Sequence, residues 1–223
     1  MLRMEGALRM TGTRENILDA SLRLFSRDGY EAVSVSMIAA ELGITKGALY
    51  RHFRNKRDIF DCLVAKMYQI DAERSVRYGV PDVSYEACPA AYRNVALNHI
   101  RDFTMAQFTF WTEDDFACQF RRMLILEQYR NAEMAELYQN CVVAGPVTYM
   151  EHIFAELIYD GVIRQEDPKQ LALAFYAPLF LLISMFDHRG GAASLQALLQ
   201  VHIDQFLRHY SSEESRKHYH ESH

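Results

Sequence analysis

Apolar residues recur every three or four positions through most of this 223-residue chain, and no stretch alternates steadily between apolar and polar residues. The 3.6-residue period is typical of amphipathic α-helices, whereas a half-buried β-strand needs a period of two. We therefore predict an all-α fold. Helices are expected at about 14–28, 35–42, 46–52, 56–77, 90–111, 114–129, 131–144, 147–160, 168–187 and 193–210, separated by capping residues and by glycine or proline.

The second and third of these helices are short and are separated by a glycine turn. Ser34 and Thr45 are suited to cap their N-termini, and Gly43 stands where the first of the pair is expected to end in a left-handed residue. Leu49 and Phe53 lie four residues apart and predict the buried side of the second helix. Two short helices joined in this way form the helix-turn-helix design, whose second helix enters the major groove of DNA.

The side of this second helix opposite Leu49 is cationic and aromatic. Lys46, Tyr50 and Arg51 carry donors that suit phosphates or the edges of bases. Gly47 removes a side chain where backbone and DNA can approach closely, although glycine inside a helix costs about 1 kcal/mol relative to alanine. The alternative interpretation of these residues is a solvated polar face without a DNA contact.

The pattern continues without interruption from about Thr13 to Tyr68, and its Leu-Tyr-x-His-Phe-x-x-Lys segment is highly specific. The residues that carry it are Leu24-Phe25, Gly29-Tyr30, Ser34-Val35, Ile38-Ala39, Gly43-Ile44, Gly47, Leu49-Tyr50, His52-Phe53, Lys56 and Ile59. On these residues the chain resembles the TetR family of bacterial transcriptional regulators. Val33 departs mildly from the pattern, since the family commonly has threonine near this position.

The resemblance implies that the recognition helix and the start of the preceding helix approach DNA. Asn55, with Asp58 three residues later, predicts the cap of the following helix. Lys56 at this N-terminus is expected to meet a phosphate, because the cation and the helix dipole attract the same anion. The expected DNA-binding residues are Ser34, Val35, Ser36, Thr45, Lys46, Gly47, Ala48, Tyr50, Arg51, His52 and Lys56.

The first clear break in the helical pattern holds a glycine and two prolines and divides the chain into two predicted domains. Residues 13–60 form the expected DNA-binding domain, from which a stiff connecting helix runs to about residue 78. Residues 79–210 form a larger helical domain that is expected to bind a ligand and to dimerise. Residues 1–12 are expected to be flexible, and residues 211–223, which are polar and unpatterned, to be a disordered tail.

Charge is divided between the two predicted domains. The chain carries a formal net charge of −5 at pH 7. Residues 1–60 hold ten Lys or Arg and seven Asp or Glu, giving +3, whereas the remaining residues hold 14 and 22, giving −8. This asymmetry lets the N-terminal part meet phosphates while the rest of the protein is repelled by the duplex.

The four cysteines lie far apart and never form a Cys-x-x-Cys pair. No leader with a basic start and an apolar run precedes them. We interpret them as reduced thiols of a cytoplasmic protein that serve as small core residues, with redox sensing by one of them as the alternative. They are Cys62, Cys88, Cys118 and Cys141.

An apolar stretch without charged residues covers residues 171–186. It is shorter than the roughly 20 apolar residues that span a bilayer, and Pro178 interrupts it, so no membrane segment is predicted. A helix that is apolar all round is instead buried on more than one side, as at a subunit interface. Together with the last helix it predicts a four-helix bundle in a homodimer, and the resemblance implies the same pairing. The expected interface residues are Leu171, Phe175, Leu179, Leu182, Phe186, Leu195, Leu198, Leu199, His202 and Phe206.

The helix near 90–111 places His99 on a stripe of apolar residues. We interpret it as a hydrogen-bonded core histidine or, alternatively, as the group that orients a ligand in a hydrophobic pocket. The resemblance implies that the C-terminal helices bind a small, often amphipathic molecule and that the protein then releases DNA. The candidate pocket residues are His99, Phe103, Phe110, Trp111, Phe120 and Met123, for which core packing is the alternative.

Motifs of enzymes and of metal sites are missing from the sequence. The chain has no phosphate-binding P-loop, no Gly-x-Ser-x-Gly elbow and no His-Glu-x-x-His pattern. His218, His220 and His223 lie in the expected tail and offer no rigid geometry, so neither a metal nor a cofactor is expected. The sequence therefore predicts a homodimeric repressor, released from a pseudo-palindromic DNA operator by a small hydrophobic effector. The alternatives are an enzyme with an incidental helix-turn-helix, which we reject, and a ligand-independent activator or architectural regulator.

Overall fold

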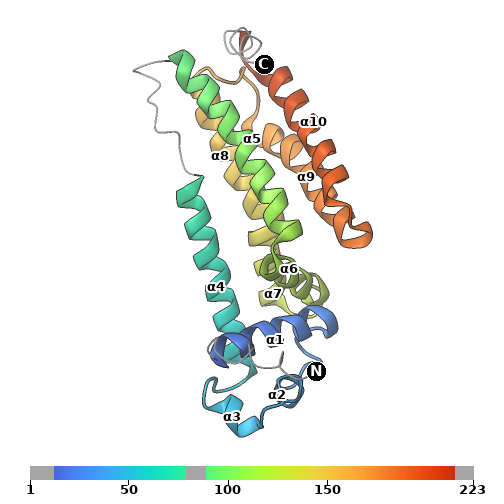
Figure 1. Cartoon of the computed structure of the whole chain (residues 1–223). Coiled ribbons are helices and arrows are strands. Elements are labelled where there is room, and N and C mark those ends of the chain that lie inside the picture. Colours follow the sequence, from blue (N-terminus) through green and yellow to red (C-terminus); the bar gives the residue numbers. More distant parts are fainter. Residues whose placement is uncertain (1–12, 79–88, 214–223) are drawn as a thin grey trace, which may run out of the picture. The chain divides into compact units, whose positions relative to one another are not determined.

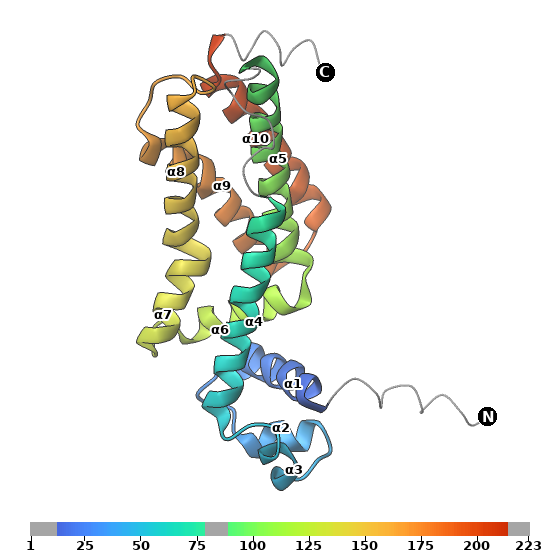
Figure 2. The ribbon, with the colours of Figure 1, turned by 90° about the vertical axis from the view of Figure 1, so that its left-hand side faces the viewer.

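The computed structural model describes residues 13–78 and 89–213, in which the regular elements are helices (Figures 1 and 2). The prediction of an all-α fold is confirmed. The expected flexible N-terminus and nearly all of the expected tail lie outside the described residues. The helices are α1 (Thr13–Asp28), α2 (Val35–Glu41), α3 (Lys46–Tyr50), α4 (Lys56–Arg77), α5 (Pro89–Glu113), α6 (Asp115–Glu127), α7 (Ala132–Tyr138), the π-helix η1 (Gln139–Val143), α8 (Ala144–Tyr159), α9 (Pro168–Arg189) and α10 (Ala192–Tyr210).

The described residues form two compact units. The first lies within Met1–Glu73 and Asp115–Ala135, and the second within Arg74–Asp114 and Glu136–His223. The sequence divided the chain once, near residue 78, and did not anticipate that α6 belongs with the N-terminal helices. The physical reason is that α6 packs along α1 and buries apolar side chains there, among them Phe120 and Met123. Which helix a given apolar face packs against is a long-range property that periodicity does not report.

The first unit places α2 and α3 beside α1 and the beginning of α4 (Figure 2). Its core contains the ring of Tyr30, whose centroid lies 5.1 Å from that of Phe25 on α1 and 5.2 Å from that of Phe60 on α4. Because Tyr30 precedes α2 by only a few residues, this contact fixes where the helix-turn-helix begins.

The second unit is built around α9, which packs against α5, α8 and α10. Figure 1 shows α9 and α10 side by side. Its core includes the rings of Phe154, Phe175 and Phe206, with centroids 4.8 to 5.5 Å apart. At one end, the backbone N–H of Ser212 donates to the carbonyl of Val162 (3.0 Å), which ties the end of α10 to the loop before α9. Residues 211 and 212 are thus ordered, which corrects the expected start of the tail.

Helices expected at 131–144 and 147–160 are one continuous helical stretch with a π-helix in its middle. Pro146 has no N–H to donate to the carbonyl of Val142, so an ordinary α-helical turn cannot form at this point. The Val142 carbonyl accepts a hydrogen bond from the hydroxyl of Tyr176 on α9 instead (2.6 Å). The glycine and proline that were read as a break therefore widen the helix without ending it.

Candidate nucleic-acid interface

Helices α2 and α3 are each started by a hydroxyl side chain. The Oγ of Ser34 accepts a hydrogen bond from the backbone N–H of Met37 (3.3 Å), and the Oγ1 of Thr45 accepts one from the N–H of Ala48 (3.1 Å). Backbone N–H groups in the first turn of a helix have no acceptor within the helix, and these bonds supply one. Both predicted caps are therefore confirmed. Gly43 turns the chain between the helices at φ 63°, a conformation that a side chain disfavours.

One face of this helix pair is buried in the first unit. Ile38 and Leu49 have no exposed surface, and Phe53 is 1% exposed. The guanidinium of Arg14 on α1 lies over the Phe53 ring, 4.9 Å from its centroid. Because these apolar anchors hold one side of each helix, the opposite side must face outward.

The outward face carries most of the predicted DNA-binding residues. Tyr50 is 49% exposed, and Lys46 and Arg51 beside it are also exposed. A phenol and two cations on one helix surface suit hydrogen bonds to phosphates and base edges. Exposed members of the predicted set are Ser34, Ser36, Thr45, Lys46, Gly47, Tyr50, Arg51 and His52, whereas Val35 and Ala48 are half-buried.

Lys56 bonds to the backbone of the same unit. Its Nζ donates hydrogen bonds to the carbonyl oxygens of Tyr30 (2.8 Å) and Glu31 (3.3 Å) and lies 4.3 Å from the centroid of the Tyr30 ring. In the protein without DNA this ammonium ion stabilises the turn between α1 and α2, and its contact with a phosphate stays a prediction. The two carbonyl oxygens belong to residues 25 and 26 positions earlier in the chain, so the local sequence around Lys56 does not predict these hydrogen bonds.

Replacing Lys56 by alanine is expected to lower the melting temperature, because two carbonyl oxygens lose a charged donor. Hydrogen bonds to charged groups contribute about 1.5–3 kcal/mol, and partial exposure of Lys56 favours the lower end of that range. The matched Lys46→Ala variant, which removes an exposed ammonium ion, is expected to melt like the wild type. Differential scanning calorimetry of both variants without DNA measures the difference, and equal melting temperatures would contradict this role of Lys56.

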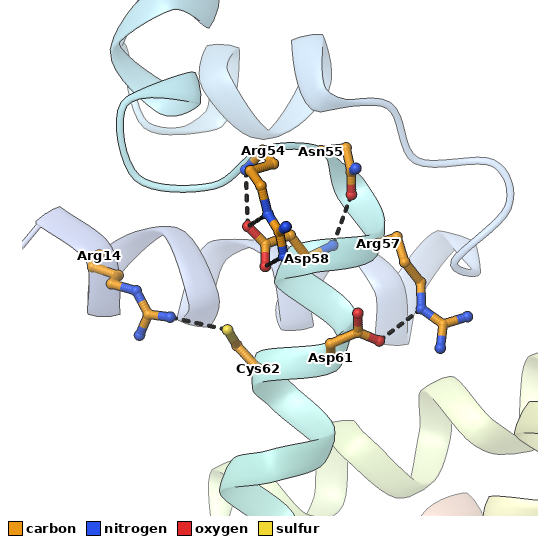
Figure 3. A network of polar contacts seen from close by, with 7 residues as sticks. All are labelled: Arg14, Arg54, Asn55, Arg57, Asp58, Asp61 and Cys62. Atoms are coloured by element: carbon orange, nitrogen blue, oxygen red, sulfur yellow. Dashed lines mark hydrogen bonds and ion pairs between the residues drawn. The ribbon is translucent and has the colours of Figure 1, made fainter.

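The turn from α3 into α4 is held by a small polar network (Figure 3). The Oδ1 of Asn55 accepts from the backbone N–H of Asp58 (2.8 Å), and Asp58 in turn accepts from the N–H of Arg54 (2.9 Å). That backbone bond, with help from the Arg54 guanidinium, lowers the pKa of the Asp58 carboxyl. Arg54 is an exposed cation just after the recognition helix that the sequence analysis did not select. Figure 3 also shows Arg14 donating to the sulfur of Cys62 (3.0 Å).

The candidate pocket residues are divided between the two units. His99, Phe103, Phe110 and Trp111 belong to the second unit, whereas Phe120 and Met123 are fully buried in the core of the first. Their role in binding a ligand stays a prediction.

His99 and Phe103 form a cluster at the end of α4 in the second unit. The Nε2 of His99 lies 2.5 Å from the carbonyl oxygen of Tyr78, as in the core-histidine interpretation. The Phe103 ring is 6.1 Å from the ring of Tyr78 and 5.4 Å from that of Tyr149 on α8, and it is half-buried. Arg74 stacks on Phe110 at 4.1 Å from the ring centroid. This aromatic cluster, with one cation at its edge, is the part of the predicted pocket that the second unit brings together.

Most of the predicted interface residues are buried within the chain. Phe186 and His202 are half-buried, and the Nε2 of His202 lies 3.0 Å from the carbonyl oxygen of Phe175. Leu198 is 56% exposed. The other predicted interface residues are exposed by 7% or less, and their contact with a partner stays a prediction; they are Leu171, Phe175, Leu179, Leu182, Leu195, Leu199 and Phe206.

A second apolar face of α9 and α10 is exposed. Leu181 is 59% exposed, Leu173 43% and Met185 36% on α9, and Val201 is 52% exposed beside Leu198 on α10. We call these five residues the exposed apolar face. Both helices are apolar on two sides, and a repeat of 3.6 residues does not tell which side packs within the subunit.

Sequence comparisons match the helix-turn-helix region to known regulators. A family model described as bacterial regulatory proteins of the tetR family matches residues 17–63. The transcriptional regulator AcrR of Shigella flexneri is 50% identical over 48 residues, which are 22% of each chain. The uncharacterized regulator YerO of Bacillus subtilis is 45% identical over 47 residues, 21% of this chain and 16% of YerO. The match thus spans about a fifth of the length of these curated relatives.

Solved structures resemble nearly the whole chain. The complex of SmeT with triclosan superposes with a TM-score of 0.68 at 21% identity, over 91% of this chain and 93% of SmeT. FadR, a fatty acid degradation regulator from Bacillus halodurans, superposes with a TM-score of 0.62 at 18% identity, over 88% and 96%. At these identities the likeness establishes a shared fold and no shared ligand.

Proposed function

We propose, on the premise that the match of residues 17–63 places this chain in the tetR family of bacterial regulatory proteins, that it is a homodimeric, sequence-specific transcriptional repressor. The family relatives are transcriptional regulators and not enzymes. The observation that carries the proposal is the exposed surface of α3, where Lys46, Tyr50 and Arg51 project from a helix whose other side is fixed by Leu49. A short helix anchored in this way can enter a major groove without losing its own packing.

The exposed apolar face supports the dimer. Two helices from each subunit can pack as a four-helix bundle, which covers apolar surface that water would otherwise contact. A two-fold dimer presents two recognition helices, so the operator is a pseudo-palindrome with half-sites about 34–36 Å apart on one side of the duplex. Leu181 and Leu198 are the most exposed leucines of this face and are proposed to lie near the two-fold axis.

The effector is proposed to be a small, largely hydrophobic molecule bound by the second unit. Supporting this, Phe103, Tyr149 and Phe110 supply aromatic surface there, and pockets for small molecules are lined mainly by such side chains. SmeT, whose fold is similar, forms a complex with triclosan. An effector that binds better to a conformer with a different half-site spacing shifts the protein toward that conformer and releases DNA.

A cytoplasmic location follows from this proposal. Among the described residues, Ala132–Tyr159 and Pro168–Asp187 are long and apolar enough to cross a membrane, with 22% and 39% of their apolar windows buried. Core helices of soluble proteins pass the same test, and the second stretch supplies the centre of the second unit and three of the five residues of the exposed apolar face. The apolar surface of α9 is thus assigned to the dimer.

The test begins with selection of a binding duplex from a randomised DNA pool, followed by mobility-shift titration. Tyr50→Ala and Lys46→Ala are each expected to weaken binding of the selected duplex by about tenfold, the loss of one good contact at about 1–3 kcal/mol. Each lost phosphate contact also reduces the salt slope by about 0.9. Tyr129→Ala and Lys169→Ala remove a similarly exposed tyrosine and lysine elsewhere and serve as matched controls.

Selection without any enriched sequence, or unchanged affinity in both α3 variants, would overturn the DNA-binding proposal. A ligand-independent activator or architectural regulator is the second candidate, because neither the helix-turn-helix nor a dimer distinguishes it from a repressor. A thermal-shift screen with lipophilic compounds separates the two. Compounds that raise the melting temperature and then release the selected duplex support the repressor, whereas their absence supports the second candidate.

A further inference from the structure

Glu127, the last residue of α6, carries a buried carboxylate in the first unit. Its side chain is 1% exposed. Oε1 accepts a hydrogen bond from the backbone N–H of Glu31 (3.3 Å), and Oε2 has no hydrogen-bond partner among the residues that the structure describes. Burying a carboxylate with one bonded oxygen is costly, and an apolar side chain at this place would avoid that cost. The contact is therefore a candidate for a role other than stability.

The segment that Glu127 contacts is the turn between α1 and α2. Gly29 in this turn has φ 89°, and a Cβ added to it would lie 2.5 Å from Oε1 of Glu127. Glycine suits the backbone conformation here, and any side chain at this position would have to displace the end of the Glu127 side chain. The turn and the end of α6 are thus fitted to one another.

The same turn is held from α4. Lys56 donates to the carbonyls of Tyr30 and Glu31, while Glu127 accepts from the N–H of Glu31. Lys56 on α4 thus binds backbone carbonyl groups of the turn, whereas Glu127 on α6 binds a backbone N–H group. Since α2 starts at Val35, a shift of this turn changes where α2 and the following recognition helix lie.

The segment that carries Glu127 is tied to both units by the chain itself. Residues Asp115–Ala135 belong to the first unit, but the residues directly before and after them belong to the second. Glu133 on α7 also forms a bidentate ion pair with Arg57 on α4, with both N–O distances 2.6 Å. Glu127 is where this segment meets the turn before α2.

We propose that Glu127 is a positioning residue for DNA binding, a latch that holds α2 and α3 in place for the duplex. The bond to Glu31 fixes the turn when α6 is docked, and withdrawal of α6 breaks that bond and frees the helix-turn-helix. The oxygen without a partner makes the docked state easy to leave. This inference rests on the proposed DNA-binding function and names the contact through which that site is regulated.

The first test is amide hydrogen exchange of the full-length protein. Glu127→Ala is expected to raise exchange about tenfold in residues 29–53, the size expected when one hydrogen bond to a charged group is lost. Peptides from α8, α9 and α10 are expected to exchange as in the wild type. Glu127→Gln keeps an acceptor oxygen and is expected to stay within threefold. Glu136→Ala, which removes an exposed carboxylate from α7, is the matched control.

The second test measures the affinity of the same variants for the selected duplex in a mobility-shift titration. Glu127→Ala is expected to weaken binding about tenfold and Glu127→Gln less than threefold, although neither side chain lies on the DNA-binding surface. A merely structural role predicts exchange that rises equally through α1 and α4 together with unchanged DNA affinity below the melting temperature. That pattern, or no change in residues 29–53, would overturn the latch.

A double-mutant cycle tests the contact itself. Gly29→Ala forces the turn against Oε1 of Glu127, whereas in a Glu127→Ala background the collision is absent and only the backbone strain remains. The exchange rate of residues 29–53 is therefore expected to rise more on Gly29→Ala with Glu127 present than without it. Equal effects in both backgrounds contradict the latch. If the wild type binds no duplex at all, the DNA-binding proposal fails, and the exchange experiments still decide the role of Glu127.

Discussion

A glutamate in place of Leu181 is expected to convert the proposed dimer into monomers. Leu181 is 59% exposed in the subunit and lies on the exposed apolar face. In a two-fold interface one substitution appears twice, and burial of an unpaired carboxylate costs several kcal/mol for each copy. The dimer dissociation constant is therefore expected to rise at least about a hundredfold, since each 1.4 kcal/mol is a factor of ten. Sedimentation velocity at micromolar concentration measures the change.

Leu126→Glu is the matched control for this experiment. Leu126 is also an exposed leucine, at 44%, but it lies on α6 in the first unit and outside the exposed apolar face. Its variant is expected to remain a dimer. A wild-type monomer at micromolar concentration, or equal behaviour of the two variants, would show that the exposed apolar face is not the interface. Loss of the dimer is also expected to weaken binding to the full operator, because a monomer reads one half-site.

Local signals in the sequence predicted the helix-turn-helix well. Ser34, Thr45 and Asn55 were expected as caps, and each accepts the backbone hydrogen bond that a cap requires. Caps depend on residues three positions away, so a single sequence contains the whole interaction. The same holds for the exposed side of α3, because burial of Leu49 determines which residues face outward.

Long-range contacts were the part that the sequence could not reveal. Lys56 was interpreted from its place at a helix N-terminus, but its ammonium ion bonds to carbonyls of a turn far earlier in the chain. Glu127 had no distinguishing neighbour in the sequence, and its partner Glu31 is 96 residues away. The sequence also does not tell which apolar side of α9 is buried within the chain. Leu179 and Leu181 are equally apolar, yet Leu179 is 3% exposed and Leu181 is 59% exposed.

The π-helix between α7 and α8 combines a local cause with a distant partner. Pro146 removes the donor for the Val142 carbonyl, and the hydroxyl of Tyr176 on α9 replaces it. Without Tyr176 a buried carbonyl would lose its partner, which costs about 1–3 kcal/mol. The wide turn is therefore stabilised by α9, the helix that also carries most of the exposed apolar face.

Gly145→Ala is expected to be among the most destabilising single changes in the described part of the chain. A Cβ at this position would lie 1.9 Å from the carbonyl oxygen of Asn140, and both atoms belong to or border backbone that cannot rotate away. The π-turn has to rearrange, and overpacking of this kind costs about 1–3 kcal/mol or more. For a chain of this size each kcal/mol lowers the melting temperature by about 2–4 °C, so a fall of roughly 5–10 °C is expected.

The matched control is the other helical glycine whose surroundings are open. A Cβ at Gly47 would meet only the Oγ1 of Thr45, at 3.9 Å, which is ordinary contact. Gly47→Ala is therefore expected to raise stability by up to about 1 kcal/mol, since alanine favours a helix over glycine. Thermal unfolding without DNA compares the two variants. If Gly145→Ala melts like the wild type, the π-turn is not constrained by Asn140, and the continuous helix from α7 to α8 has another cause.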